Sequence, residues 1–177
     1  MRHLTPSDYT RQPWKNGKGV TVELCRAERD GAIVYRLSMA TVAEDGPFSL
    51  FPGIDRNLTV ISGPGFRLTG EGIALDCQPL VPVAFPGDVA VSASGTAAGV
   101  SEDFNVMTAR TLPRPEVAVL QDAPLLVGES LVAVFALAPL RLGARSLARH
   151  DLLLGAGLSG AVTGGPALVV RLHGLSG

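Results

Sequence analysis

Hydrophobic and polar residues alternate along many short stretches of this chain. Valine and leucine occupy every second position of VTVELCR at residues 20–26, and IVYRLSMATVA at residues 33–43 repeats the pattern. A period of two is typical of β-strands, because successive side chains point to opposite faces of a sheet. The Asp-Gly pair at 30–31 favours a tight hairpin turn between these two stretches. One face of this hairpin is then predicted to be polar, with Thr21, Glu23, Arg36 and Ser38.

Further short strands are predicted along the rest of the chain, between turns rich in glycine and proline. They are NLTVIS, FRLT, VPVAFP, DVAVS and DFNVMT in the first part, and EVAVL, LLVG, LVAVFAL, LRLG, DLLLG and ALVVRL in the second. Two prolines, Pro113 and Pro115, interrupt the pattern, and no helical pattern exceeds about two turns. The sequence therefore predicts an all-β fold with two sheet-rich domains, residues 1–112 and 113–177.

Composition and charge narrow the range of functions. The chain has 177 residues, 46% of them hydrophobic, and a formal net charge of −1 without runs of like charge. This disfavours a nucleic-acid or membrane-surface binder and leaves a small ligand as the expected partner. The longest apolar run is far shorter than the ~20 residues of a membrane helix, and no signal-peptide pattern is present, so a cytoplasmic protein is expected. The second half is apolar with few charged residues, so a homodimer formed through it is conceivable.

Cysteine and histidine usage gives no sign of a disulfide or a metal centre. The two cysteines, Cys25 and Cys77, form no C-x-x-C pair and are expected to be reduced, half-buried thiols. The three histidines, His3, His150 and His173, are far apart in the sequence and form no metal-binding motif. We therefore expect neither a metal nor another cofactor.

The stretch QPWKNGKGVT at residues 12–21 is the first candidate for a binding site. A phosphate-binding Walker loop needs glycine at position 12 and serine or threonine at position 19, but the chain has Gln12 and Gly19. Glycines nevertheless let this backbone approach a ligand closely, and three neighbouring side chains offer polar groups: Trp14, Lys15 and Asn16. The alternative is a surface turn capped by Asn16.

Two later stretches offer further candidates. In DGPFSLFPGIDRNL, Phe48 and Phe51 flank Ser49, and Asp55-Arg56 begins a strand. An arginine in apolar surroundings binds a carboxylate through two hydrogen bonds, and Asp55 could orient it. The alternative is that Asp55 caps the turn and Arg56 extends into solvent. In EDFNVM, Asp103 and Asn105 share one strand face, where they could line a pocket or pair across the sheet.

Four of these motifs together resemble the HutD/Ves family. They are PWKNGKGVTVE, RLSMATVAEDGPFSLFPGIDRNLTVISG, FPGD and DFNVM, in this order, and they cover about the first 110 residues strongly. The resemblance implies a bicupin, two small β-barrels of the RmlC-like cupin type packed together. It also implies a role in histidine utilisation, through binding of N-formylglutamate by a regulator of that pathway.

The resemblance also implies a set of ligand-binding residues in the first barrel. They are Trp14, Lys15, Asn16, Arg36, Ser38, Ser49, Phe51, Asp55, Arg56, Asp103 and Asn105. One departure is visible, since Lys18 stands where the family usually has glycine. Two other functions remain open: a cofactor-free isomerase or hydrolase with Lys15 or Asp103 as proton-transfer group, and a protein-interaction module without a ligand. Arg36 could serve as a second cation for a dicarboxylate if Glu23 does not neutralise it.

Overall fold

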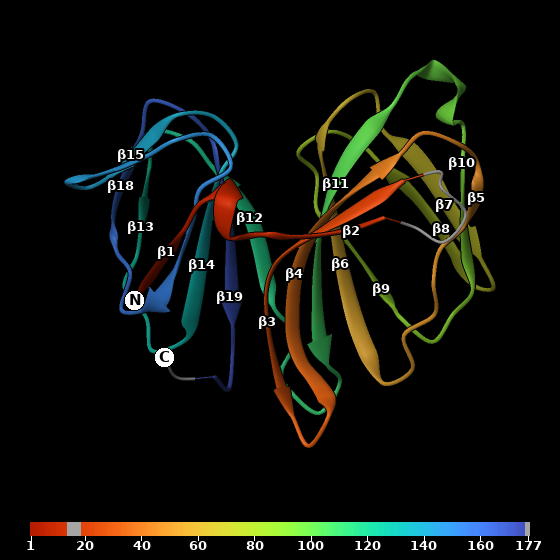
Figure 1. The fold of residues 1–177 in the computed structure, drawn as a ribbon, viewed down its shortest axis with the longest axis horizontal. Helices are drawn as coiled ribbons and strands as arrows, with labels where there is room; N and C mark the ends of the chain where they lie inside the picture. The colour runs from red at the N-terminus through yellow and green to blue at the C-terminus, as the bar shows by residue number, and fades with distance from the viewer. Residues whose placement is uncertain (14–18, 176–177) are drawn as a thin grey trace. The chain divides into compact units, whose positions relative to one another are not determined.

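The computed structural model describes residues 1–13 and 19–175, and almost every regular element in them is a β-strand (Figure 1). The described helices are two short 3-10 turns, η1 at Pro6–Asp8 and η2 at Thr96–Ala98. The prediction of an all-β fold is confirmed. No helix in the described part of the chain is long and apolar enough to cross a membrane.

The chain forms two compact units. One comprises Thr10–Thr111, and the other combines Met1–Tyr9 with Leu112–Gly177. The sequence placed the first nine residues with the first domain, whereas the structure groups them with the second unit.

The Thr10–Thr111 unit consists of two sheets. The six-stranded sheet has the order β2-β3-β4-β11-β6-β9, and the four-stranded sheet has the order β5-β10-β7-β8 (Figure 1). The first contains β2 (Thr10–Pro13), β3 (Val20–Arg29), β4 (Ala32–Val42), β6 (Ile54–Ser62), β9 (Val83–Pro86) and β11 (Ser101–Ala109). The second contains β5 (Gly46–Pro47), β7 (Phe66–Gly70), β8 (Ile73–Cys77) and β10 (Val91–Ser94).

The predicted β3–β4 hairpin is confirmed. The two strands pair antiparallel, and the turn between them contains Asp30 and Gly31 with φ of 52° and 77°. Both residues adopt the left-handed conformation that a two-residue hairpin turn requires, which explains the Asp-Gly pair at this position. The register shifts between Glu23 and Cys25, so a β-bulge bends β3 beside the polar part of the hairpin.

Apolar side chains from both sheets form the core of this unit. Val42, Leu58 and Val60 contribute from the six-stranded sheet, and Phe66 and Leu68 from the four-stranded sheet. Because side chains alternate along a strand, the face of β6 and β4 that bears these core residues continues into the polar positions nearer the hairpin. The core therefore occupies part of the space between the sheets and leaves the rest for polar groups.

The second unit repeats the two-sheet arrangement. Its five-stranded sheet has the order β1-β17-β14-β19-β12, and its four-stranded sheet has the order β13-β18-β15-β16. The first contains β1 (Arg2–Leu4), β12 (Glu116–Leu120), β14 (Leu131–Ala136), β17 (Leu152–Ala156) and β19 (Ala167–Leu172). The second contains β13 (Ala123–Leu125), β15 (Leu140–Leu142), β16 (Arg145–Leu147) and β18 (Gly160–Thr163). Leucine, valine and alanine fill its core.

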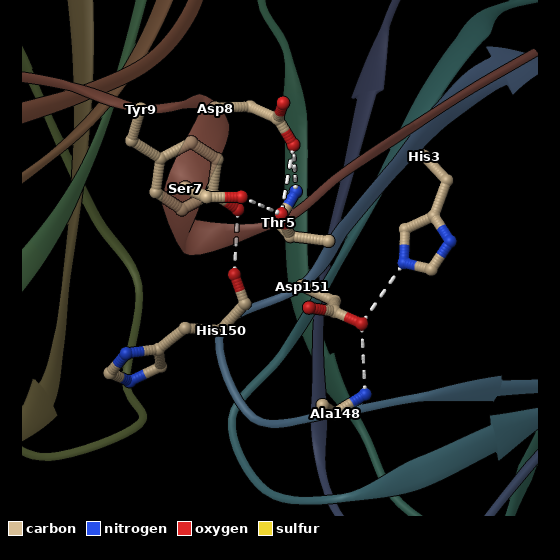
Figure 2. Close-up of polar contacts among 8 residues, drawn as sticks. All are labelled: His3, Thr5, Ser7, Asp8, Tyr9, Ala148, His150 and Asp151. Atoms are coloured by element: carbon tan, nitrogen blue, oxygen red, sulfur yellow. Dashed lines mark hydrogen bonds and ion pairs between the residues drawn. The ribbon is translucent and has the colours of Figure 1, made fainter.

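Hydrogen bonds explain why the N-terminal residues belong to the second unit. Strand β1 pairs with β17, and His3 Nε2 lies 3.0 Å from Asp151 Oδ2 (Figure 2). The Tyr9 hydroxyl donates to the carbonyl oxygen of His150 at 2.6 Å. The ring of His150 points away from Asp151 in Figure 2 and stacks on Phe135. His3 and His150 thus belong to one unit as structural contacts, despite their separation in the sequence.

Candidate functional site

A cavity of about 560 Å³ opens between the two sheets of the Thr10–Thr111 unit. It is lined by seven of the residues that the sequence proposed as ligand-binding: Arg36, Ser38, Ser49, Phe51, Arg56, Asp103 and Asn105. A cavity of this size is typical of small-molecule sites.

Strand register brings these polar residues together. Strand β11 lies between β4 and β6, with Asn105 opposite Ser38 on one side and Met107 opposite both Arg36 and Arg56. Because a strand has a period of two, Asp103, Asn105 and Met107 all face the cavity. Three strands that are distant in sequence therefore present one polar surface.

Arg56 lies at the centre of this surface and is only 6% exposed. Its Nη2 donates to Asn105 Oδ1 at 2.9 Å, and its Nη1 donates to the Ser49 carbonyl at 3.3 Å. Its guanidinium carbon lies 4.9 to 5.4 Å from the centres of three aromatic rings, those of Phe48, Phe51 and Phe85. The rings exclude water and attract the cation through their faces.

The guanidinium keeps its charge in spite of this burial. Burial lowers the pKa of Arg56 to about 10, while the charge of Asp103 opposes the shift. Arg56 is therefore a cation at neutral pH. Its Nε is buried and has no hydrogen-bond partner among the described residues. A buried cation whose hydrogen bonds go to neutral oxygens favours an anion in the cavity.

Asp103 is the acidic counterpart of Arg56 in the cavity wall, and its side chain is fully buried. Asn105 Nδ2 donates to Asp103 Oδ1, and Oδ2 has no hydrogen-bond partner within residues 1–13 and 19–175. Burial raises the pKa of Asp103 to about 7, while Arg56 and the bond from Asn105 oppose this rise. The carboxyl group therefore exchanges its proton near neutral pH, as catalytic and ligand-binding groups often do.

Arg36 is already paired with an acidic residue. Its Nε donates to Glu23 Oε2 at 2.7 Å, and its Nη1 contacts the Met107 sulfur at 3.9 Å. Both side chains of the ion pair are largely buried, with 12% and 13% exposure. Glu23 thus neutralises Arg36, and the condition for Arg36 to act as a free second cation is not met.

One proposed site residue does not reach the cavity. Asp55 precedes Arg56 on β6, and the alternation of side chains turns it to the opposite face of the sheet. There its carboxylate accepts from Arg110 Nε at 3.0 Å. Asp55 therefore does not orient Arg56 as the sequence suggested. Arg110 also pairs with Asp88 of the FPGD motif, and the Asp88 carboxylate accepts a hydrogen bond from the Gly53 amide at 2.6 Å.

Trp14, Lys15 and Asn16 lie outside the residues that the structure describes, as does Lys18. Their proposed roles remain predictions from the sequence. The neighbouring Gln12 and Pro13 of β2 do line the cavity.

Sequence reasoning missed several residues of the cavity wall. Thr21 lines the cavity from β3, where it lies opposite Ala40, and its place on the polar hairpin face was the available signal. Met107 continues the alternation of Asp103 and Asn105 by one more step. Phe85 is not part of the cavity wall but lies against the Arg56 guanidinium, and nothing in the local sequence of the FPGD motif, which it begins, pointed to this contact.

The described residues contain no group of three or more histidine, cysteine, aspartate or glutamate side chains that could hold a metal ion. Both cysteines are free, as expected from the sequence, but they are buried and not half-buried. The chemistry that the described cavity offers is therefore ionic and hydrogen-bonding, from a buried arginine, a buried carboxyl group and a carboxamide.

Comparisons with known proteins agree with this architecture. The structure of HutD from Pseudomonas fluorescens SBW25 (formate condition) superposes with a TM-score of 0.85 at 32% identity, covering 97% of this chain and 98% of that one. A cupin 2 conserved barrel domain protein from Leptotrichia buccalis has a TM-score of 0.55 at 9% identity, covering 88% and 89%. The latter likeness concerns the fold alone, and the predicted bicupin fold is confirmed.

Sequence relatives give the family. An uncharacterized 21.2 kDa protein in the hutC 3′ region of Pseudomonas putida is 40% identical over 114 residues, which are 62% of this chain and 58% of that protein. The match thus spans less than two thirds of that relative. The family model described as HutD matches residues 6–164. This chain belongs to the HutD family.

Proposed function

We propose that the chain binds a small acidic metabolite in the cavity of the Thr10–Thr111 unit, and that N-formylglutamate is its ligand. The single observation that carries the proposal is Arg56, a buried cation at the cavity wall whose described hydrogen bonds go to neutral oxygens. A ligand carboxylate would accept charge-assisted hydrogen bonds from the Arg56 guanidinium, which in the described structure donates to neutral oxygens. The unpartnered Nε of Arg56 is one further donor for it.

The other groups of the cavity suit the rest of such a ligand. N-formylglutamate carries a formamide as well as two carboxylates, and Asn105, Ser38 and the Asp103 carboxyl offer hydrogen-bonding partners for an amide. The rings of Phe48 and Phe51 would cover its methylene groups. Membership of the HutD family supports a regulatory role in histidine utilisation, with the ligand as the metabolite that is sensed.

Isothermal titration calorimetry with N-formyl-L-glutamate tests this proposal. We expect saturable binding to the wild-type protein and a loss of at least about 30-fold in affinity for Arg56→Met, since an unpaired carboxylate costs about 2 kcal/mol or more. Methionine removes the guanidinium but still fills the space among the phenylalanines with an unbranched apolar side chain. Circular dichroism will verify the fold. Arg67→Met is the matched control, because Arg67 is exposed on β7, and it should bind like wild type. No binding to the wild-type protein at millimolar ligand would refute the ligand assignment.

A second candidate function is supported by Asp103. A buried carboxyl group with a pKa of about 7 beside a cationic arginine is suited to general acid–base catalysis. In that case the protein is a cofactor-free isomerase or hydrolase of a small acid. Incubating N-formyl-L-glutamate with the protein and following its proton NMR spectrum separates the two functions. Product formation that Asp103→Asn abolishes would favour the enzyme, and an unchanged spectrum with bound ligand would favour the binding protein.

A further inference from the structure

We propose that the cavity takes up one proton at Asp103 when an anionic ligand binds to Arg56, so that affinity for the anion falls as pH rises. This inference rests on the proposed function, because it concerns ligand binding at the same site. It adds a property that the binding of a carboxylate by arginine does not require, namely a dependence of that binding on proton concentration.

Asp103 makes no direct ion pair with Arg56 in the described structure. The Asn105 carboxamide lies between the two charged groups, since its Oδ1 accepts from Arg56 and its Nδ2 donates to Asp103. The second carboxyl oxygen of Asp103 has no hydrogen-bond partner in the described chain. This oxygen can therefore accept a proton without breaking a described hydrogen bond.

The charges around Asp103 are balanced before a ligand enters. Arg56 on β6 and Arg36 on β4 are the described cations of the cavity, and Glu23 on β3 pairs with Arg36. Ionised Asp103 then balances Arg56. The Cys77 thiol on β8 stays neutral, because burial first, and then Asp103, raise its pKa to about 12.

Glu102 and Asp76 complete the acidic groups near this cluster. Glu102, which precedes Asp103 on β11, accepts from the Ser62 hydroxyl at 2.9 Å. The carboxylate of Asp76 on β8 accepts from the Gln78 side chain at 2.8 Å. Neither carboxylate lines the cavity.

A ligand carboxylate adds a negative charge to this balanced cluster. Two carboxylates that share one buried cation repel each other, and such repulsion raises the pKa of the group that can accept a proton. Protonation of Asp103 restores neutrality and provides an O–H donor facing the cavity. The proton is accessible near neutral pH because burial already raises the pKa of Asp103 to about 7 in the free protein.

The expected pH dependence follows from linkage. Below the pKa of Asp103 in the free protein the proton is already present, and affinity is constant. Above it, each pH unit weakens binding by up to about tenfold, until the pKa of the complex is reached. Between about pH 6 and about pH 8 the Kd should therefore rise about tenfold.

Titration calorimetry at about pH 6, 7 and 8 tests the inference, in two buffers of different ionisation enthalpy at each pH. N-formyl-L-glutamate and glutarate are the probes, because glutarate has both carboxylates but no formamide. We expect proton uptake with both above about pH 7, which separates charge coupling from recognition of the amide. Asp103→Asn should bind with a Kd independent of pH and, at about pH 8, about tenfold more tightly than wild type. Asp76→Asn is the matched control, because Asp76 is exposed on β8 and does not line the cavity, and it should keep the wild-type dependence.

The outcomes separate the two proposals. A wild-type Kd that is constant across this pH range, with no buffer-dependent heat, would overturn the proton coupling while leaving the ligand assignment intact. Retention of the pH dependence in Asp103→Asn would overturn the role of Asp103. The proton count uses the wild-type protein alone, so it decides the question even if a variant does not fold. Absence of binding at every pH would overturn the proposed function and this inference together.

Discussion

Replacing Asp103 by asparagine should stabilise the folded protein at neutral pH. Burial raises the pKa of Asp103 from 3.8 to about 7. Between these two values the unfolded chain releases the proton while the folded protein keeps it, so the free energy of unfolding of the wild-type protein falls as pH rises. A shift of about three units corresponds to about 4 kcal/mol by neutral pH. The isosteric amide is neutral in both states and can still accept from Asn105, so the variant lacks this loss.

Urea denaturation followed by circular dichroism, at pH values from about 4 to about 7, measures the effect. At about pH 4, wild type and Asp103→Asn should have similar free energies of unfolding. At about pH 7, the free energy of unfolding of the variant should exceed that of wild type by up to about 4 kcal/mol. Other titrating groups cancel in the difference. Asp76→Asn, which removes an exposed carboxylate on β8, should show no such trend. A stability difference that is constant over this pH range would refute the reasoning, because Asp103 would then titrate alike in both states.

Three further predictions concern packing and backbone geometry. Phe85→Leu removes the ring nearest the buried guanidinium and should lower the free energy of unfolding by about 1 to 3 kcal/mol in urea denaturation; an unchanged midpoint would contradict this role. Gly63→Ala should lower Tm by about 4 °C or more, because φ is +86° and a Cβ would lie 2.2 Å from a carbonyl oxygen, while Gly46→Ala, with open space, should not. His3→Ala removes the 3.0 Å contact with Asp151 and should speed amide hydrogen exchange in the first strand about fivefold; unchanged exchange rates would contradict this role.

The central strands β3 and β4 were predictable because hydrophobic and polar side chains alternate along them. Alternation across residues 20–42 gave β3, β4 and their turn. Edge strands were harder to detect, since β2 is exposed along its length and contains Pro13. The predicted strand LLVG is only partly present, because β13 ends at Leu125 and the next two hydrophobic residues are 68% and 70% exposed. The hydrophobic pattern of a short segment does not show whether a neighbouring strand is available to pair with it.

The site was predictable to the extent that it depends on period-two alternation. That rule placed Asp103 with Asn105 and Arg36 with Ser38. It did not decide which of the adjacent Asp55 and Arg56 faces the cavity, because this choice depends on how β6 pairs with β11. The burial that shifts the pKa of Asp103 likewise arises from packing of strands distant in sequence.

The pairing of β1 with β17 has a consequence for how the protein is made. Strand β1 finds its partner late in translation, because the contacting residues His3 and Asp151 are separated by 148 positions. Thr10–Thr111 can complete its hydrogen-bond ladders earlier, while β1 remains unpaired until β17 has been synthesised. Closing so long a loop has an entropic cost that grows with its length. Translation that stops before residue 152 therefore leaves β1 as an unpaired edge, open to association with other nascent chains.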